Sequence, residues 1–487
     1  MNIASITAEL APWCKTGGLG DVAGALPSAL TSIDSSVQHA SFVPLYASVR
    51  QAVQARDDTL VDTGVTFQCT LAGRLWHGRW LALQHAAPWS VYFLDCDPLF
   101  SAPGLYEMSP ITEADTSDWT PSLAVKFAFL CEAAYGSMDA LMGRPDIVHC
   151  HDWHTGPLVQ RLAQAHKTNR PSTLLTIHNL AYQGDFEGAD CPEVLDDEQT
   201  RLHFLKSGIH HADVVSTVSP RYADEIKTAE FGCGLHAELD DIKVHGILNG
   251  IGDEWNPMTD PLIEANFGQG QPTGKKACRE ALLAHCGWST TPPELILGAV
   301  ARLDYQKGLD WVAALVPKLS ALGARLVLLG TGDPALETKF RALAQQQPES
   351  CAAHLIFDVP LSHQIIAGSD ALLVPSRFEP CGLTQLYAMR YGTVPIVNPV
   401  GGLHDTVVDP RNVSIELPRG TGFTMHEPTD HGLYTAVQRA AECWHRDPTQ
   451  WANLVTAGYE FDSSWQASAT QYLSLMRTMR SAGSTPK

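Results

Sequence analysis

A short turn between an apolar strand and a helix carries one acid in a place suited to phosphate. The segment Ser376–Gln385 follows the strand-like run Ala371–Val374 and precedes a helix with apolar positions at Leu386 and Met389. Such turns lie at the carboxyl edge of a parallel sheet, where doubly wound folds bind ligands and free backbone N–H groups attract anions. Glu379 is the only acid in the turn. The combination predicts sugar-nucleotide chemistry.

Two cations leave the end of another predicted strand, Ile296–Val300. Arg302 and Lys307 follow that strand, and Asp304 is the only acid near them in the sequence. Two cations at one strand end could clamp the oxygens of a diphosphate. The alternative is a solvated surface pair. The glycines of Gly330–Asp333, which closes the next strand, would let the backbone approach a ligand closely.

A glycine-rich turn, Lys15–Asp21, follows the first predicted strand and opens a helix. Gly17 and Gly18 would let the backbone approach a ligand, and Lys15 would supply a charge for phosphate or sugar oxygens. A dinucleotide fingerprint fits less well, because the turn is too long and the second predicted strand lacks an acid for a ribose. A purely structural glycine turn remains an alternative.

Polar and aromatic residues also follow two neighbouring predicted strands. Asp152 and Trp153 suit sugar binding, because a carboxylate accepts hydrogen bonds from hydroxyls and an indole covers a pyranose face. The alternative for Asp152 is a helix N-cap. His178 ends the next strand, and its place at the same sheet edge as Lys15 and Asp152 favours a functional role over a structural one.

Two segments resemble metal sites without making strong ones. The histidines of His149–His154 could bind zinc, but zinc sites usually draw ligands from more than one segment. Asp95-Cys96-Asp97 resembles the D-x-D motif that holds a metal and a nucleotide diphosphate, but Pro98 and the apolar residues after it favour an ordinary turn. We therefore predict no metal.

Composition limits the partners and the compartment. A formal charge of −20 argues against nucleic acid or an anionic membrane as partner. No stretch approaches the roughly 18 uninterrupted apolar residues of a membrane span. The 12 cysteines show no C-x-x-C pair or regular spacing, which indicates reduced thiols. The N-terminus enters a strand without a basic leader. These features predict a cytoplasmic protein.

The order of predicted elements indicates two doubly wound α/β domains. The length of 487 residues exceeds one ordinary core. Buried strands alternate with helices in two series, as in parallel sheets covered by helices. The predicted strands are Ile3–Thr7, Ala40–Val43, Val91–Asp95, Asp146–Cys150 and Thr173–Ile177, then Ile296–Val300, Arg325–Leu329, Leu355–Asp358, Ala371–Val374 and Val394–Val397. We predict a join near Asn249–Pro257 and a last helix at Ser464–Met479.

Taken together, these motifs resemble those of bacterial glycogen synthases and plant starch synthases, retaining glucosyltransferases of the two-domain GT-B fold. The likeness covers nearly the whole chain. The motifs that carry it are Lys15–Val22, His151–Gly156, Thr176–Gly184, Val218–Pro220, Leu248–Gly250, Arg302 with Gln306–Leu309, Pro375–Gln385, Gly401–Leu403, and Phe461 with Ser464-Trp465.

The resemblance implies an architecture. Two Rossmann-like domains would face each other across a cleft and close about the connections between them. Residues 1–248 would form the starch-synthase catalytic domain on the acceptor side, and residues 249–463 the nucleotide-sugar-binding domain. Residues 464–487 would form a helix that crosses back to pack on the first domain.

The resemblance also implies an activity: glucose transfer with retention from ADP-glucose to the non-reducing 4-OH of an α-1,4-glucan, with neither metal nor cofactor. Arg302 and Lys307 would hold the leaving diphosphate, Glu379 would contact the donor near the reacting sugar, and Phe357 would stack on adenine. His178 and Asp152 would orient the transferred glucose and the acceptor. Other substrate-binding positions are Lys15, Gly17, Gly18, Asp21, Trp153, Asn249, Cys381, Gly382, Leu383 and Thr384.

Three alternatives stay open. Glu379 could be a nucleophile that forms a glycosyl-enzyme. The chain could be a related retaining transferase that uses UDP-glucose or another acceptor, although Tyr387 stands where broader relatives carry a second glutamate. It could also be a non-catalytic glucan-binding homologue, which the retained motif residues disfavour.

The sequence departs from the family's pattern in two places. Gly252 replaces the usual Asp, which follows one place later as Asp253. Pro121-Ser122 and Lys126-Phe127 replace an Asp-Asn…Arg-Phe signature, and the nearby loop Ser101–Ser109 also differs. Acceptor preference and rate depend on these first-domain segments.

Overall fold

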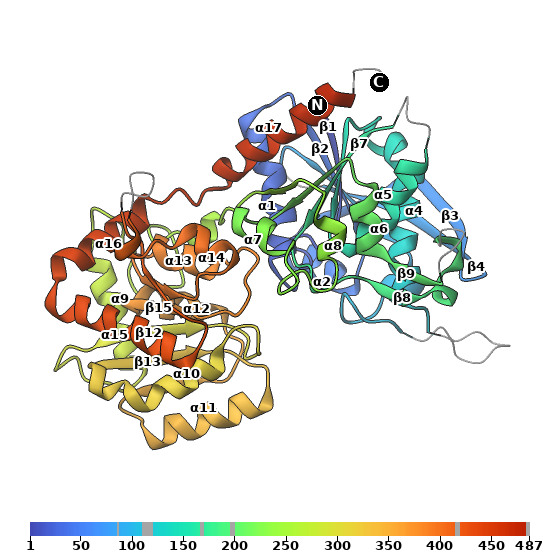
Figure 1. Ribbon diagram of the computed structural model, residues 1–487. Helices are drawn as coiled ribbons and strands as arrows, with labels where there is room; N and C mark the ends of the chain where they lie inside the picture. The colour runs from blue at the N-terminus through green and yellow to red at the C-terminus, as the bar shows by residue number, and fades with distance from the viewer. Residues whose placement is uncertain (85–86, 110–119, 166–169, 195–199, 414–418, 484–487) are drawn as a thin grey trace. The chain divides into compact units, whose positions relative to one another are not determined.

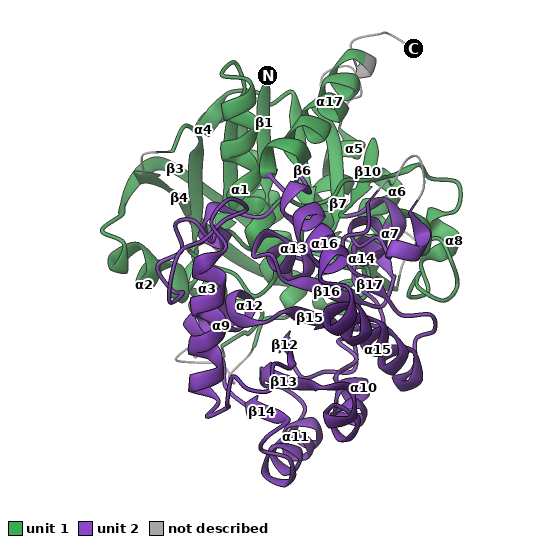
Figure 2. Ribbon diagram, turned by 90° about the vertical axis from the view of Figure 1, so that its left-hand side faces the viewer, with its two compact units in different colours: residues 1–218, 223–250, 465–487 green, residues 219–222, 251–464 purple. Residues whose placement is uncertain are grey.

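The chain folds into two compact units. The computed structural model describes residues 1–84, 87–109, 120–165, 170–194, 200–413 and 419–483. Unit 1 comprises Met1–Val218, Ala223–Gly250 and Trp465–Lys487, and unit 2 comprises Ser219–Tyr222 and Ile251–Ser464 (Figure 2). In the described part of the chain, no helix combines the length and apolar character needed to cross a bilayer.

Unit 1 is built on a mixed sheet that runs, among the described residues, in the order β11-β10-β7-β6-β1-β2-β5-β4-β3. Seven of these strands pair in parallel, and the long hairpin β3–β4 adds antiparallel strands at one edge. The strands are β1 (Asn2–Ile6), β2 (Gln38–Pro44), β3 (Thr59–Leu71), β4 (Arg74–Gln84), β5 (Ser90–Asp95), β6 (Ile147–His151), β7 (Ser172–Ile177), β10 (Val214–Thr217) and β11 (Val244–Gly246). A separate small sheet pairs β8 (Asp185–Glu187) with β9 (Arg201–His203).

The helices of unit 1 include one that comes from the end of the chain. They are α1 (Gly18–Ile33), α2 (Ala47–Ala55), α3 (Asp97–Phe100), α4 (Leu123–Met142), α5 (Gly156–Gln164), α6 (Phe204–His211), α8 (His236–Leu239) and α17 (Trp465–Gly483). Helix α17 lies beside α1 (Figure 1). The buried Tyr472 and Met476 share one apolar cluster with Leu26 and Leu30. The last helix therefore completes the core of the first unit.

Unit 2 is built on a sheet whose described strands are all parallel, in the order β14-β13-β12-β15-β16-β17. Its central strands are nearly unbroken apolar runs, as expected where helices cover both faces. The strands are β12 (Leu295–Val300), β13 (Ala324–Leu329), β14 (Cys351–His354), β15 (Ala371–Val374), β16 (Val394–Val397) and β17 (Phe423–Thr424). The helices are α9 (Thr273–His285), α10 (Leu309–Leu315), α11 (Pro334–Gln346), α12 (Val359–Gly368), α13 (Thr384–Arg390), α14 (Gly401–Thr406), α15 (Asp430–Arg446) and α16 (Pro448–Glu460), and α7 (Pro220–Glu225) spans the boundary between the units.

Each of the two large sheets has, among its described strands, a point where successive connections turn in opposite directions. In unit 1 the chain passes from β1 to β2 on one side and later adds β6 on the other. In unit 2, β13 and β15 lie on opposite sides of β12. Side chains that follow the two central strands meet at such a point, which is the usual ligand site of a doubly wound sheet.

Nine of the ten predicted strands are present, with ends that differ by at most two residues. The strand predicted at Leu355–Asp358 is wrong, because β14 ends at His354. Its last ladder partner is Leu329, where β13 itself ends, so the chain beyond has no strand to pair with. Asp358 instead caps α12, accepting a hydrogen bond from Leu361 N at 2.9 Å. The hairpin β3–β4 and the strands β8 to β11 and β17 were not predicted from the sequence.

Candidate active site

In unit 2, the loops that follow β12 and β15 bring a lysine and a glutamate together. Lys307 Nζ lies 2.6 Å from Glu379 Oε2, and Ser376 Oγ donates to the same oxygen at 2.8 Å. The Glu379 residue is only 7% exposed. Along the sequence Asp304 is the acid near Lys307, but the fold brings Glu379 to it from 72 positions away.

The two loops are also joined through their backbones. Arg377 N donates to Gln306 O at 2.8 Å, and Gln306 Nε2 donates to Phe378 O at 3.1 Å. Gly401 lies against the same turn: a Cβ there would stand 2.0 Å from Glu379 O. The turn that carries Glu379 is therefore held from two sides, and Gly401 is required by close packing.

Arg302 is placed differently from Lys307. Its side chain is 67% exposed, and Nη2 lies 3.3 Å from Asp304 Oδ2. An exposed pair of this kind contributes little to stability. Arg302 can therefore turn toward a ligand at low cost, whereas Lys307 is held in place.

The residues predicted to contact the nucleotide lie along the same carboxyl edge. Phe357, just past β14, is 87% exposed. A ring this exposed has a face free to stack on a planar group such as a base. Gly382, Leu383 and Thr384 are half-buried at the start of α13, whereas Cys381 is buried at 5% exposure. A second exposed ring, Tyr305, was missed; it is 74% exposed and stacks on the Arg377 guanidinium at 4.0 Å.

In unit 1, the glycine-rich turn after β1 is organised by an acid that the sequence analysis missed. The buried Glu9 accepts hydrogen bonds from Thr16 N (2.7 Å), Thr16 Oγ1 (2.7 Å), Gly17 N (3.2 Å) and Tyr106 Oη (2.6 Å). Its carboxylate thus supplies the acceptors for a loop that belongs to no strand or helix. Lys15 Nζ pairs with Asp21 Oδ1 at 2.7 Å.

The glycines of this turn and of the first turns of α1 fall into two kinds. A Cβ on Gly17 or Gly18 would meet nothing within 4 Å, so both leave space beside the backbone. A Cβ on Gly20 would stand 2.5 Å from the Lys15 Cβ, and one on Gly24 would stand 2.4 Å from Ala11 O. The structural interpretation therefore holds for Gly20 and Gly24, while Gly17 and Gly18 leave room for a ligand.

Asp152 stands at the end of β6 in a strained conformation. Its φ is 56°, in the left-handed region that a residue with a side chain rarely adopts. Its Oδ1 accepts from His178 N at 2.6 Å and Asn179 N at 3.4 Å, and the side chain makes no helix cap. Asp152 does stand at the N-cap position of the short helix Trp153–Thr155, but its side chain does not cap that helix and instead joins the ends of β6 and β7. Burial raises its pKa to about 7, although these hydrogen bonds act in the opposite direction.

His178 and Trp153 are both buried, but in different surroundings. Burial lowers the pKa of His178 to about 3, so the ring is neutral at pH 7, and its Nε2 lies 3.0 Å from His151 Nδ1. Trp153 is 8% exposed and packs among Phe127, Phe186 and Phe204. The indole is thus part of the core and offers no free face to a pyranose, contrary to the sequence-based expectation.

Asn249, after β11, is 6% exposed, and its Oδ1 has no hydrogen-bond partner among the described residues. A buried carbonyl oxygen without a donor is costly, so it marks a place where a ligand or water belongs.

No group of three or more His, Cys, Asp or Glu in the described chain has a metal-binding arrangement. Asp95 and Asp97 of the D-x-D segment both pair with Arg50.

The loop Ser101–Ser109, which departs from the family pattern, is held by a buried lysine. Lys126 is fully buried on α4 and donates to Leu105 O at 2.7 Å and Glu107 O at 3.0 Å. Burial lowers its pKa to about 8. Lys126 therefore holds the altered loop in place.

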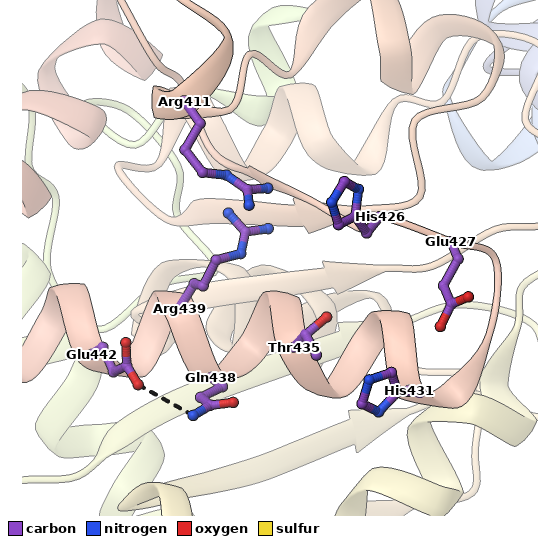
Figure 3. A pocket seen from close by; sticks show the side chains of 8 residues that line it. All are labelled: Arg411, His426, Glu427, His431, Thr435, Gln438, Arg439 and Glu442. Carbon is purple, nitrogen blue, oxygen red and sulfur yellow. Dashed lines mark hydrogen bonds between the residues drawn. The ribbon is translucent and has the colours of Figure 1, made fainter.

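A hollow of about 450 Å³ lies beside β17 and α15, and none of the groups described above lines it (Figure 3). Its lining residues are Arg411, His426, Glu427, His431, Thr435, Gln438, Arg439 and Glu442. Both arginines bind the buried Asp409, Arg439 Nη1 at 2.7 Å and Arg411 Nε at 3.0 Å. Burial alone would raise the pKa of Asp409, but these bonds outweigh it and lower the pKa to about 2. The arginines thus already neutralise a buried acid.

Comparisons with known proteins extend over the whole chain. A family model described as "Starch synthase catalytic domain" matches residues 2–241, and "Glycosyl transferases group 1" matches residues 294–440. A glycogen synthase of Anaeromyxobacter dehalogenans is 41% identical over 98% of this chain and 99% of its own length. A glycogen synthase of Granulibacter bethesdensis is 38% identical over 98% of both chains.

Solved structures give the same result. The catalytic domain of starch synthase IV from Arabidopsis thaliana, bound to ADP and acarbose, matches with a TM-score of 0.84 and 31% identity over 99% of both chains. A sucrose-phosphate synthase from Thermosynechococcus elongatus matches with a TM-score of 0.59 at 19% identity, which is evidence for the fold alone.

Proposed function

We propose that this chain, which belongs to the family of glycogen and starch synthases, transfers glucose with retention from ADP-glucose to the non-reducing 4-OH of an α-1,4-glucan. Its two α/β units are those of the GT-B fold. Support for the donor comes from the starch synthase that matches along its full length and was solved with ADP. Support for the acceptor comes from the glycogen synthases at about 40% identity.

The observation that carries the proposal is the Lys307–Glu379–Ser376 group at the unit 2 switch point. As the bond between glucose and diphosphate breaks, negative charge grows on the diphosphate and positive charge on the sugar ring. Lys307, held in place by Glu379, and the exposed Arg302 would take the diphosphate oxygens. Glu379 would then face the developing positive charge.

This arrangement favours an orienting or charge-stabilising Glu379 over a nucleophilic one. Its Oε2 already accepts from Lys307 and from Ser376. Both contacts stabilise the charged carboxylate and so make it a weaker nucleophile. Retention would then follow from attack of the acceptor hydroxyl on the face that the diphosphate leaves, with a phosphate oxygen accepting the proton.

Unit 1 would supply the contacts to the sugars. Asp152 and His178, joined at the ends of β6 and β7, offer an acceptor and a neutral imidazole to hydroxyl groups. Lys15 would approach the donor, with Gly17 and Gly18 leaving room for it. Asn249 Oδ1, which has no hydrogen-bond partner in the described part of the chain, would accept from a substrate hydroxyl.

We also propose that the reaction needs no metal or cofactor and takes place in the cytoplasm. The two cations of unit 2 can meet the charge of the leaving group, so activity should survive EDTA. The 12 cysteines, all in the described part of the chain, form no disulfide. A reducing compartment is consistent with that pattern.

The test is an assay of nucleotide release and chain elongation with ADP-glucose or UDP-glucose and glycogen. We expect turnover with ADP-glucose and a loss of at least about a hundredfold in Lys307→Ala, because the leaving group loses a fixed charge. Lys276→Ala is the matched control, since that side chain is 78% exposed on α9. Preference for UDP-glucose would favour the related transferase, and no turnover with either donor would sink the enzyme proposal.

A further inference from the structure

We propose that His151 and Ser5 fix the proton of His178 on Nδ1, so that His178 acts as a hydrogen-bond donor toward the transferred sugar. The inference rests on the proposed function, in which His178 contacts that sugar. His151 is thus a positioning residue that acts through His178. Its contacts belong entirely to unit 1.

Three buried side chains form a continuous hydrogen-bonded series. Ser5 Oγ, on β1, lies 3.0 Å from His151 Nε2 on β6. His151 Nδ1 lies 3.0 Å from Nε2 of His178, which directly follows β7. Their residues are 3%, 1% and 8% exposed, so water has little access to the series. The strands β1, β6 and β7 are neighbours in the sheet, which keeps the series in register.

The positions of the protons can be assigned only if both imidazole rings are neutral, so that each ring carries one N–H. Burial lowers the pKa of His178 to about 3. Burial, with His149 and His178 nearby, also holds the pKa of His151 well below its ordinary value. Each ring therefore carries one N–H at pH 7, and each of the two short contacts holds one proton.

The serine decides the direction of the series. Among the described residues, His151 Nε2 is the one hydrogen-bond partner of Ser5 Oγ. If Ser5 donates, His151 carries its proton on Nδ1, donates to His178 Nε2, and leaves the His178 proton on Nδ1. In the opposite direction the Ser5 hydroxyl hydrogen would be buried without an acceptor, which is the costlier state.

The consequence concerns specificity for sugar oxygens. With its proton on Nδ1, His178 offers an N–H to a lone pair of the bound sugar. Asp152, which binds His178 N through Oδ1, offers acceptors. Asp152 and His178, at the ends of β6 and β7, would thus present one acceptor and one donor. A sugar hydroxyl can both donate and accept, so it can bind both.

The direct test is the tautomer of His178 in the wild-type protein, read from nitrogen NMR spectra of histidine labelled with ¹⁵N. His178→Gln assigns the signals. We expect a protonated Nδ1 and a bare Nε2. A protonated Nε2 in the wild type would overturn the inference, and this measurement needs no activity.

The kinetic test compares two amides at position 151. The amide of His151→Asn reaches the Nδ1 position and can still donate to His178, whereas that of His151→Gln reaches the Nε2 position and keeps only Ser5. We expect kcat/KM for the donor to fall about threefold in the Asn variant and at least about tenfold in the Gln variant. A packing role predicts the reverse, because Gln is nearer to His in volume, so that order would also overturn the inference.

The two proposals can fail separately. If the wild-type protein transfers no glucose, the proposed function falls while the spectra still decide the tautomer. If glucose is transferred but the tautomer or the order of the variants is reversed, only the role of His151 falls. Ser5→Ala, a small change in a strand, gives a third check: loss of the donor should let both tautomers of His178 appear in the spectra.

Discussion

Asp152 lies in surroundings that lower the stability of the fold and suit a functional role. It combines a φ of 56° with a carboxyl at 6% exposure. Burial raises its pKa from 3.8 to about 7, against the hydrogen bonds from His178 N and Asn179 N. A buried, strained acid at the edge of a sheet is costly to keep and is typical of a functional site.

The raised pKa makes stability fall with rising pH. Between pH 3.8 and about 7 the folded protein holds a proton on Asp152 that the unfolded chain has released, so the free energy of unfolding decreases through that window. Asp152→Asn removes this loss, and Asn can still accept from His178 N. We expect the difference in the free energy of unfolding, variant minus wild type, to be about 2–4 kcal/mol larger at pH 8 than at pH 4. The variant should also lose activity.

Denaturant unfolding at the two pH values measures this effect. Asp240→Asn, an exposed acid on the same unit, serves as control and should leave the pH dependence of stability unchanged. Equal destabilisation of the Asp152 variant at both pH values would contradict the assignment of the raised pKa to this carboxyl.

Glu9 is predicted to act on the donor through the loop that it holds. In Glu9→Ala the backbone N–H groups of Thr16 and Gly17 lose their acceptor, so the loop carrying Lys15 should loosen. We expect KM for the donor to rise about tenfold, with a smaller rise in Glu9→Gln, which keeps one acceptor oxygen. Faster trypsin cleavage after Lys15 would report the loosening independently. Unchanged cleavage and KM in the Ala variant would refute this role.

The residue types of the site could be predicted from sequence where they belong to a motif, and not elsewhere. The glycines of Lys15–Asp21, the cations Arg302 and Lys307, and Glu379 could be predicted because each follows a strand-like run at a short distance. Glu9 was missed because its partners are backbone N–H and hydroxyl groups that form no motif with it, and the Lys307–Glu379 contact because it joins two distant loops. The burial of Trp153 depends on phenylalanines from other elements, which local sequence does not show.

At the scale of elements, apolar runs located most strands, and the strands located the site. The motifs follow β1, β6, β7, β12 and β15 because a parallel sheet gathers its carboxyl ends at one edge. The strand predicted at Leu355–Asp358 is wrong for a related reason. A strand ends where the neighbouring strand ends, and a local apolar pattern does not show where that neighbour is.

Helix α17 provides a prediction for an element. Met476 is fully buried in the cluster that α17 forms with α1, so Met476→Ala should lower the stability of unit 1 by about 2–5 kcal/mol. Arg477→Ala on the same helix is the control, because that side chain is 59% exposed. Thermal unfolding measures both. Equal effects would indicate that α17 does not complete the unit 1 core.

At the scale of the whole molecule, the chain has separate apolar cores on the two units. One cluster joins α1, α17 and the unit 1 strands, and others fill the space around the unit 2 sheet. Cores of this kind are expected to unfold as separate cooperative transitions. The transition that moves in Met476→Ala then identifies unit 1.

These transitions should respond to different ligands. If the diphosphate and adenine bind Lys307, Arg302 and Phe357, ADP at about 100 times its Kd should raise the unit 2 transition by about 5–10 °C and leave that of unit 1 nearly unchanged. Lys307→Ala should abolish most of the shift, and Lys276→Ala should keep it. A malto-oligosaccharide should move the unit 1 transition instead. An ADP shift confined to the transition that Met476→Ala lowers would place the nucleotide on the other unit and contradict the division of roles, because a ligand stabilises the unit that holds its contacts.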